Sequence, residues 1–70
     1  MTPKQCRMAR AGLNWTVREL GLKASVMPNT VTNFEKDRGV NSSTIKAIKA
    51  AFLETGLVKF NGDNCVCVEE

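Results

Sequence analysis

The sequence predicts a mainly α-helical domain that ends in a short β-hairpin. Apolar residues recur at helical spacing through residues 1–56, and Pro, Ser, Thr and Gly stand where helices begin and end. Residues 57–70 instead contain two β-rich runs around an Asn-Gly turn. A chain of 70 residues is long enough for one domain only. We therefore expect four helices in residues 1–56, followed by a hairpin that is not a separate domain.

The first helix is expected to begin almost at the N-terminus. Thr2 is a capping residue, Pro3 takes the first helical position, where a missing N–H costs nothing, and Gln5 completes a capping box. Gly12 weakens the helix, which is expected to end near this residue.

The second helix begins after Trp15. Thr16 is the expected N-cap, with Glu19 as its reciprocal partner three residues later. Trp15 is placed to pack on Leu20 as a hydrophobic staple, and we expect its ring in the core rather than on a ligand. Because a turn follows at Ser25, this helix has about two turns.

The third helix is expected to run from Pro28 to Lys36. Its apolar residues are Val31 and Phe34, and the rest of it is mostly amides and hydroxyls. Gly39 is expected to take a left-handed turn conformation after the helix.

A fourth helix and a hairpin complete the expected fold. The helix follows a group of capping residues at 41–43 and stops at Gly56. Its apolar stripe consists of Ile45, Ile48, Phe52 and Leu53. The two strands are expected in 57–60 and 65–68.

Composition excludes most enzymes. The chain has no His and no Tyr, which removes the commonest general base and metal ligand, and no cofactor is expected. Glu19 and Glu35 are interpreted as capping and ion-pair residues, not as a catalytic pair. No apolar run is long enough to span a bilayer, so we expect a soluble, cytoplasmic protein without membrane contact.

Positive charge is concentrated in the helical part of the chain. Residues 1–56 hold nine basic and four acidic residues, a net +5, whereas residues 57–70 hold one basic and three acidic residues, a net −2. This distribution favours a helical surface that faces a polyanion and a hairpin turned away from it.

The cysteines do not predict a metal site within one chain. Cys65 and Cys67 point to the same side of a strand, but Cys6 is distant and there is no His, so four ligands cannot be assembled. We expect no bound metal and two buried strand cysteines. A redox or intermolecular role is the alternative.

Residues 15–36 read Trp-Thr-Val-Arg-Glu-Leu-Gly-Leu-Lys-Ala-Ser-Val-Met-Pro-Asn-Thr-Val-Thr-Asn-Phe-Glu-Lys. This stretch resembles the helix-turn-helix of the Cro/phage-repressor (xenobiotic-response-element-like) family of bacterial and phage regulators. The resemblance covers roughly residues 1–56, with the motif in 16–36. Its matching residues are Glu19, Leu20, Gly21, Ala24, Val26, Thr30, Val31, Thr32, Phe34 and Glu35.

The resemblance implies a lambda-repressor-like four-helix domain that binds double-stranded DNA, with the helix 28–36 in the major groove. The base-reading candidates on that helix are Asn29, Thr32, Asn33 and Lys36. The phosphate-contact candidates are Thr16, Arg18, Arg38, Asn41, Ser43 and Lys46. The expected function is transcriptional regulation, most simply repression, by a homodimer on an inverted repeat.

The hairpin is the expected dimerisation element. Its apolar residues exceed what one helix face can cover, and its open edge can extend the sheet into a second subunit. The candidate interface residues are Leu57, Val58, Phe60, Val66 and Val68.

The motif departs from the family at several positions. Val17 stands where Gln is frequent, Met27 and Pro28 where polar residues are frequent, and Ser25 and Asp37 where Gly is frequent. Two groups that commonly contact the phosphate and the first base are thereby missing. The alternative function is a helix-turn-helix-like module that binds and masks another regulatory protein, as an antiactivator or antitoxin does.

Overall fold

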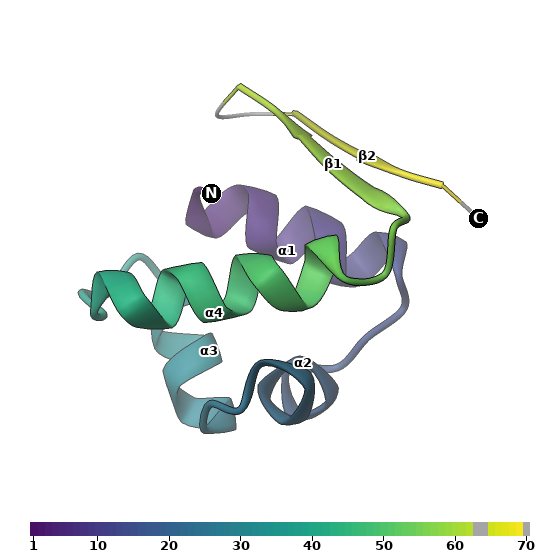
Figure 1. Cartoon of the computed structure of the whole chain (residues 1–70). Coiled ribbons are helices and arrows are strands. Elements are labelled where there is room, and N and C mark those ends of the chain that lie inside the picture. Colours follow the sequence, from purple (N-terminus) through teal and green to yellow (C-terminus); the bar gives the residue numbers. More distant parts are fainter. Residues whose placement is uncertain (63–64, 70) are drawn as a thin grey trace.

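Four helices and a two-stranded antiparallel hairpin follow one another in the computed structural model of the chain (Figure 1). The structure describes residues 1–62 and 65–69. The elements are α1 (Pro3–Gly12), α2 (Val17–Ala24), α3 (Pro28–Glu35), α4 (Ser42–Leu53), β1 (Val58–Asn61) and β2 (Cys65–Val68). The hairpin lies on one side of α1 and α4, and α2 and α3 lie on the other side (Figure 1). The predicted fold class, mainly helical with a C-terminal hairpin, is confirmed.

The first two helices begin at the predicted caps. The Thr2 hydroxyl accepts a hydrogen bond from the Gln5 N–H at 3.2 Å, and the Gln5 side chain accepts one from the Thr2 N–H at 3.0 Å. Thr16 caps α2 by accepting from the Glu19 N–H at 3.1 Å. These bonds satisfy N–H groups that have no partner inside a helix.

The chain turns at residues other than the predicted glycine. Asp37 has the left-handed conformation after α3, with φ of 61°, and Ser25 has it after α2, with φ of 59°. The prediction for Gly39 is wrong, because α3 ends at Glu35 and its reversal therefore falls two residues later, at Asp37. Asp tolerates this conformation better than most residues with a side chain. α4 ends at Leu53, and the left-handed conformation that reverses the chain follows at Gly56, with φ of 70°, the residue predicted to stop this helix.

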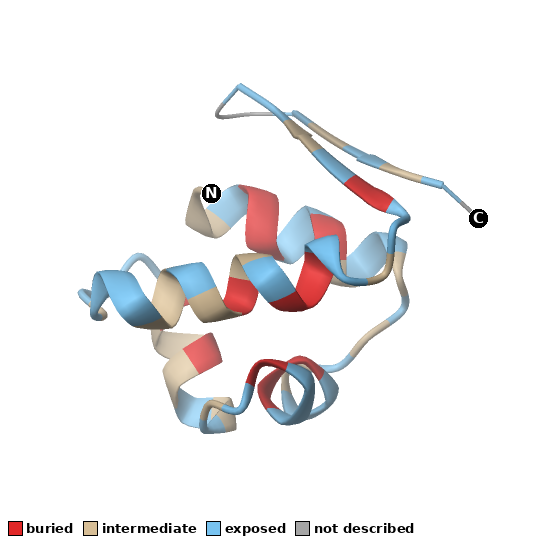
Figure 2. Cartoon of the chain, viewed as in Figure 1, coloured by how far each residue is buried: buried red, intermediate tan, exposed pale blue. Residues whose placement is uncertain are grey.

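The core forms where the helices face one another (Figure 2). Its buried apolar residues are Cys6, Ala9, Leu20, Ala24, Val31, Phe34, Ile48, Ala51, Phe52 and Val58. Trp15 is half-buried against this core, and its ring stacks on Phe52 with the centroids 5.6 Å apart. Leu53, predicted on the apolar stripe of α4, is 48% exposed because it lies at the end of the helix, one residue past the buried Phe52.

The hairpin has an apolar inner face and a polar outer face. Val58 pairs with Val68 and Phe60 with Val66, and these residues pack toward the core, with Phe60 edge-on to Phe52. The outer pairs are Lys59 with Cys67 and Asn61 with Cys65, and all four residues are exposed. The prediction that Cys65 and Cys67 are buried is wrong, because the register turns them away from α1 and α4.

Among the described residues, 1–62 and 65–69, no helix combines the length and the apolar character needed to cross a membrane. The longest, α4, has 12 residues.

Candidate functional site

The inner face of α3 packs closely against α2 and the turn between them. Val31 and Phe34 are buried in the core. A Cβ added at Gly21 would lie 2.8 Å from the carbonyl oxygen of Val26, which is closer than real contacts allow. Gly21 therefore permits the three-residue turn to fold back against α2, as its small size predicts.

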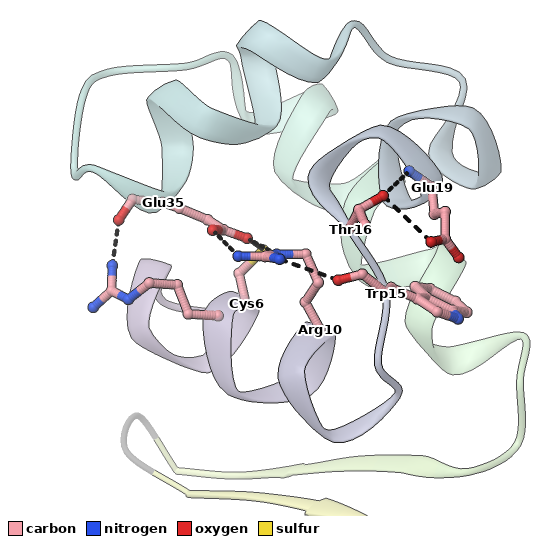
Figure 3. Close-up of polar contacts among 7 residues, drawn as sticks. Cys6, Arg10, Trp15, Thr16, Glu19 and Glu35 are labelled. Atoms are coloured by element: carbon pink, nitrogen blue, oxygen red, sulfur yellow. Dashed lines mark hydrogen bonds and ion pairs between the residues drawn. The ribbon is translucent and has the colours of Figure 1, made fainter.

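Glu35 fixes the end of α3 to α1 through a buried polar cluster (Figure 3). Its carboxylate accepts two hydrogen bonds from the Arg10 guanidinium, from Nε and Nη2, each at 2.9 Å. The Cys6 thiol donates to the same carboxylate at 3.3 Å, and Arg7 donates to the backbone carbonyl of Glu35. Arg10 also donates to the Trp15 carbonyl at 3.1 Å, so one guanidinium connects α1, α3 and the segment that precedes α2. Paired, planar bonds of this kind fix geometry as well as adding energy.

The cluster changes the ionisation of the groups around Glu35. Burial raises the pKa of the Cys6 thiol, and the neighbouring Glu35 carboxylate raises it further, so Cys6 stays a neutral hydrogen-bond donor. The hydrogen bond from Arg10 to Glu35 raises the pKa of that guanidinium. The predicted ion-pair role of Glu35 is confirmed, and its partner is Arg10.

The opposite face of α3 presents polar side chains that have no partner among the described residues. The four base-reading candidates are spaced i, i+3, i+4 and i+7 and therefore lie along one side of the helix. They are Asn29, Thr32, Asn33 and Lys36. Asn29 and Lys36 are exposed, and Thr32 and Asn33 are half-buried. No hydrogen bond or ion pair joins these four side chains to any other residue in ranges 1–62 and 65–69. Their amides, hydroxyl and ammonium are therefore available to a ligand.

The phosphate-contact candidates lie at the beginnings of the two helices next to α3. Arg18 is exposed in the first turn of α2. Asn41, the N-cap of α4, makes no capping hydrogen bond with its side chain. The others near this end of α4, all exposed, are Arg38, Ser43 and Lys46. Thr16 differs, because its hydroxyl already contacts the Glu19 N–H and, at 3.4 Å, the Glu19 carboxylate.

The hairpin residues predicted to contact a second subunit face the core of their own chain. Val58 is 4% exposed and belongs to the core of its own chain, on the side of β1 that meets α4, so its side chain is not presented to a second copy. Phe60, Val66 and Val68 are half-buried against the same core. Leu57, at 39%, is the exposed member of the set.

An apolar groove beside α2 was not predicted. Leu22 is 76% exposed and Met27 is 69% exposed, and both line a hollow of about 590 Å³. Its remaining lining residues are Arg18, Gly21, Ser25, Val26 and Pro28. The signal in the sequence was the spacing of Leu22, two residues from the buried Leu20 and so on the opposite side of the helix.

No protein-family model matches the chain, and no curated protein matches it significantly. Its function must therefore be inferred from the geometry of α3 and its neighbours.

Proposed function

We propose that the chain is a sequence-specific DNA-binding transcriptional regulator of the Cro/phage-repressor type, with a lambda-repressor-like helix-turn-helix in α2 and α3. The observation that carries the proposal is the division of α3 into two faces. Val31, Phe34 and Glu35 fix one face to the domain, and the other face holds polar side chains that have no partner within residues 1–62 and 65–69. A helix whose one face packs against the domain and whose opposite face is exposed suits insertion into the major groove, which is about 12 Å wide.

Asn29 and Asn33 are the proposed base-reading residues. They lie one turn apart on the free stripe of α3. An Asn amide can donate to and accept from one adenine edge, which is worth about 1–3 kcal/mol of discrimination against a wrong base. Thr32 suits a thymine methyl or a phosphate, and Lys36 suits a guanine or a phosphate.

The proposed phosphate contacts flank the reading helix. Arg18 and the free N–H groups at the start of α2 suit one phosphate. Arg38 and Lys46, with Asn41 and Ser43 between them in sequence, suit a second group of phosphates near the start of α4. The net +5 of residues 1–56 supports this assignment, since phosphate contacts supply much of the affinity of DNA-binding proteins.

The regulator is proposed to act as a repressor in the cytoplasm of a bacterium. It would be encoded by the bacterium itself, by a phage or by a mobile element. Two copies on an inverted repeat would place their α3 helices in successive major grooves about one helical turn apart. Bound copies would then exclude polymerase from the promoter. A single module of this size buries little surface, so specific affinity depends on the pair.

A selection on random duplexes tests this function. The proposal predicts enrichment of a palindromic site, and binding to that site whose logarithm falls linearly with the logarithm of salt concentration as counterions are released. Failure to enrich any sequence at low salt contradicts it.

The apolar groove at Leu22 and Met27 favours one alternative, a module that binds and masks another regulatory protein. Exposed apolar surface of this kind is typical of protein-binding sites. Binding at such a groove depends weakly on salt and is lost in Leu22→Ser and Met27→Ser, whereas the duplex interaction depends steeply on salt. The two functions are therefore separable in one titration series.

A further inference from the structure

Cys65 and Cys67 are exposed on the outer face of β2, although free cysteines are among the most buried residues in proteins. Two polar side chains of β1 share this face with them. The amide of Asn61 donates to the Cys67 sulfur at 3.4 Å, and Lys59 is the register partner of Cys67.

Among the described residues, no strand pairs with the edge of β2 that faces away from β1. The Glu69 N–H donates to the Leu57 carbonyl at 2.7 Å, which makes this a hydrogen-bonded pair of the antiparallel ladder. Such pairs alternate along the ladder, so Cys67 also directs its peptide groups to β1, and the carbonyl of Cys65 accepts a hydrogen bond from Gln5 Nε2 of α1 at 3.1 Å. The peptide groups of Val66 and Val68 consequently face the open edge, and β1 is the only strand paired with β2 among the described residues.

A second copy can add to this edge as an antiparallel strand. With the two-fold axis at Val66, the two copies of this residue form a hydrogen-bonded pair. Cys65 then lies opposite Cys67 of the partner subunit, in a non-hydrogen-bonded pair with Cα atoms about 4.5 Å apart. The symmetric pair lies next to it on the same face, so four thiols surround the axis.

We propose that this face forms a zinc site shared by two copies of the chain, with Cys65 and Cys67 of each copy as the four ligands. Within one chain, the described residues bring no three potential metal ligands together, so the site is incomplete without the second copy. Four thiolates at about 2.3 Å and in tetrahedral arrangement are a common zinc ligand set. Binding releases the four thiol protons to solvent and involves no oxidation.

Charge and hydrogen bonding around the site fit this metal. Zn²⁺ and four thiolates carry a net charge of −2, which the two Lys59 ammonium groups, one from each copy, offset. Asn61 provides a hydrogen bond to a ligand sulfur, as groups around metal sites usually do. A pair of intermolecular disulfides would use the same cysteines but would require an oxidant, so a reduced protein distinguishes the two.

The test measures zinc content and mass together. The full chain, reduced and freed of metal by a chelator, is titrated with Zn²⁺ and examined by sedimentation and metal analysis. We expect half an equivalent of zinc per chain in a dimer, and the absorption of tetrahedral thiolate ligation when Co²⁺ replaces zinc. No DNA is present, so the result is independent of the proposed DNA binding.

Variants on the exposed outer face are not expected to alter folding. Cys65→Ser and Cys67→Ser should each abolish the stoichiometric metal and the metal-dependent dimer, whereas Cys6→Ala, which removes the buried thiol, should keep both. Asn61→Ala should weaken zinc binding about 10-fold at unchanged stoichiometry. The proposal is overturned by zinc bound to a monomer, by no binding, or by a dimer that forms only through disulfides.

Discussion

The two faces of α3 use polar residues in opposite ways. On the inner face, Glu35 is 7% exposed and accepts four hydrogen bonds, three at its carboxylate and one at its backbone carbonyl. The donors are Cys6, Arg7 and Arg10 of α1. On the outer face, Asn29 makes no hydrogen bond with the described residues. The polar side chain on the inner face has its hydrogen-bond partners within the chain, whereas Asn29 on the outer face has none among the described residues.

This difference indicates how a short helix becomes a rigid reading element. α3 has 8 residues and no side-chain N-cap, so its own hydrogen bonds cannot hold it in place. Glu35 and the close approach at Gly21 fix both ends of the helix to neighbouring elements. Changes to the inner face should therefore alter stability, and changes to the outer face should alter binding alone.

Removing the charge of Glu35 should have the largest effect on stability. Glu35→Gln leaves Arg10, whose side chain is 25% exposed, without its partner inside the domain. We expect a loss of about 2–4 kcal/mol in the free energy of unfolding, somewhat below the full cost of a buried unpaired charge because Arg10 reaches solvent. Urea denaturation followed by circular dichroism measures it.

Glu54→Gln provides the control for this change, because Glu54 is an exposed carboxylate without an ion pair to the described residues. It should change stability by less than about 0.5 kcal/mol. Equal, small losses in both variants would show that the Glu35 cluster does not hold α3.

Filling the space at Gly21 should have the next largest effect. In Gly21→Ala the new Cβ would meet the Val26 carbonyl at 2.8 Å, so the turn must move, at a cost of about 1–3 kcal/mol. Gly39→Ala is the matched control, since nothing lies within 4 Å of its Cβ, and it should be neutral or slightly stabilising. Thermal unfolding of both variants checks the difference, and a Gly21→Ala protein as stable as Gly39→Ala would exclude the close packing.

Alkaline pH should weaken the inner face through Cys6. Because burial raises the pKa of Cys6 above its ordinary value of 9.0, the unfolded chain loses this proton at lower pH than the folded one. The contribution of the neutral Cys6 thiol to the free energy of unfolding is thus fully present below about pH 9. It falls as pH rises beyond this value, by up to about 1.4 kcal/mol per pH unit. Denaturation curves between pH 8 and 10.5 should show this decline in the parent protein and a flatter profile in Cys6→Ala. Identical profiles would contradict it.

Loss of one phosphate contact should have the smallest effect. Arg18→Gln is expected to weaken binding to all duplexes alike by about 0.5–1 kcal/mol and to reduce the salt slope by about 1. Lys4→Gln, which changes an exposed cation of α1 outside the proposed contacts, should leave both unchanged, and fluorescence anisotropy at several salt concentrations can test this. Similar salt slopes for both variants would show that Arg18 does not contact a DNA phosphate.

Local rules predicted most of the fold. The capping residues Thr2 and Thr16 were identified because a cap is a short-range hydrogen bond between neighbours in sequence. The hairpin followed from the Asn61-Gly62 turn, and the small size of Gly21 from the spacing of the motif.

Features that depend on tertiary context were not predicted. The exposure of Cys65 follows from which face of the hairpin meets α1 and α4, and strand periodicity alone does not decide this. Val58 is buried for the same reason. The partner of Glu35 lies 25 residues away in the chain, at Arg10, so no local pattern identified it.

If the exposed polar face of α3 reads DNA sequence, altering its reading residues should change the sequence that the protein selects. The parent chain and the double variant Asn29→Ala/Asn33→Ala, which should fold equally well, are each used to select from random duplexes. We expect a palindromic site for the parent protein and a relaxed preference for the variant at the bases read by the two amides. The same site enriched with the same preference by both proteins would contradict it.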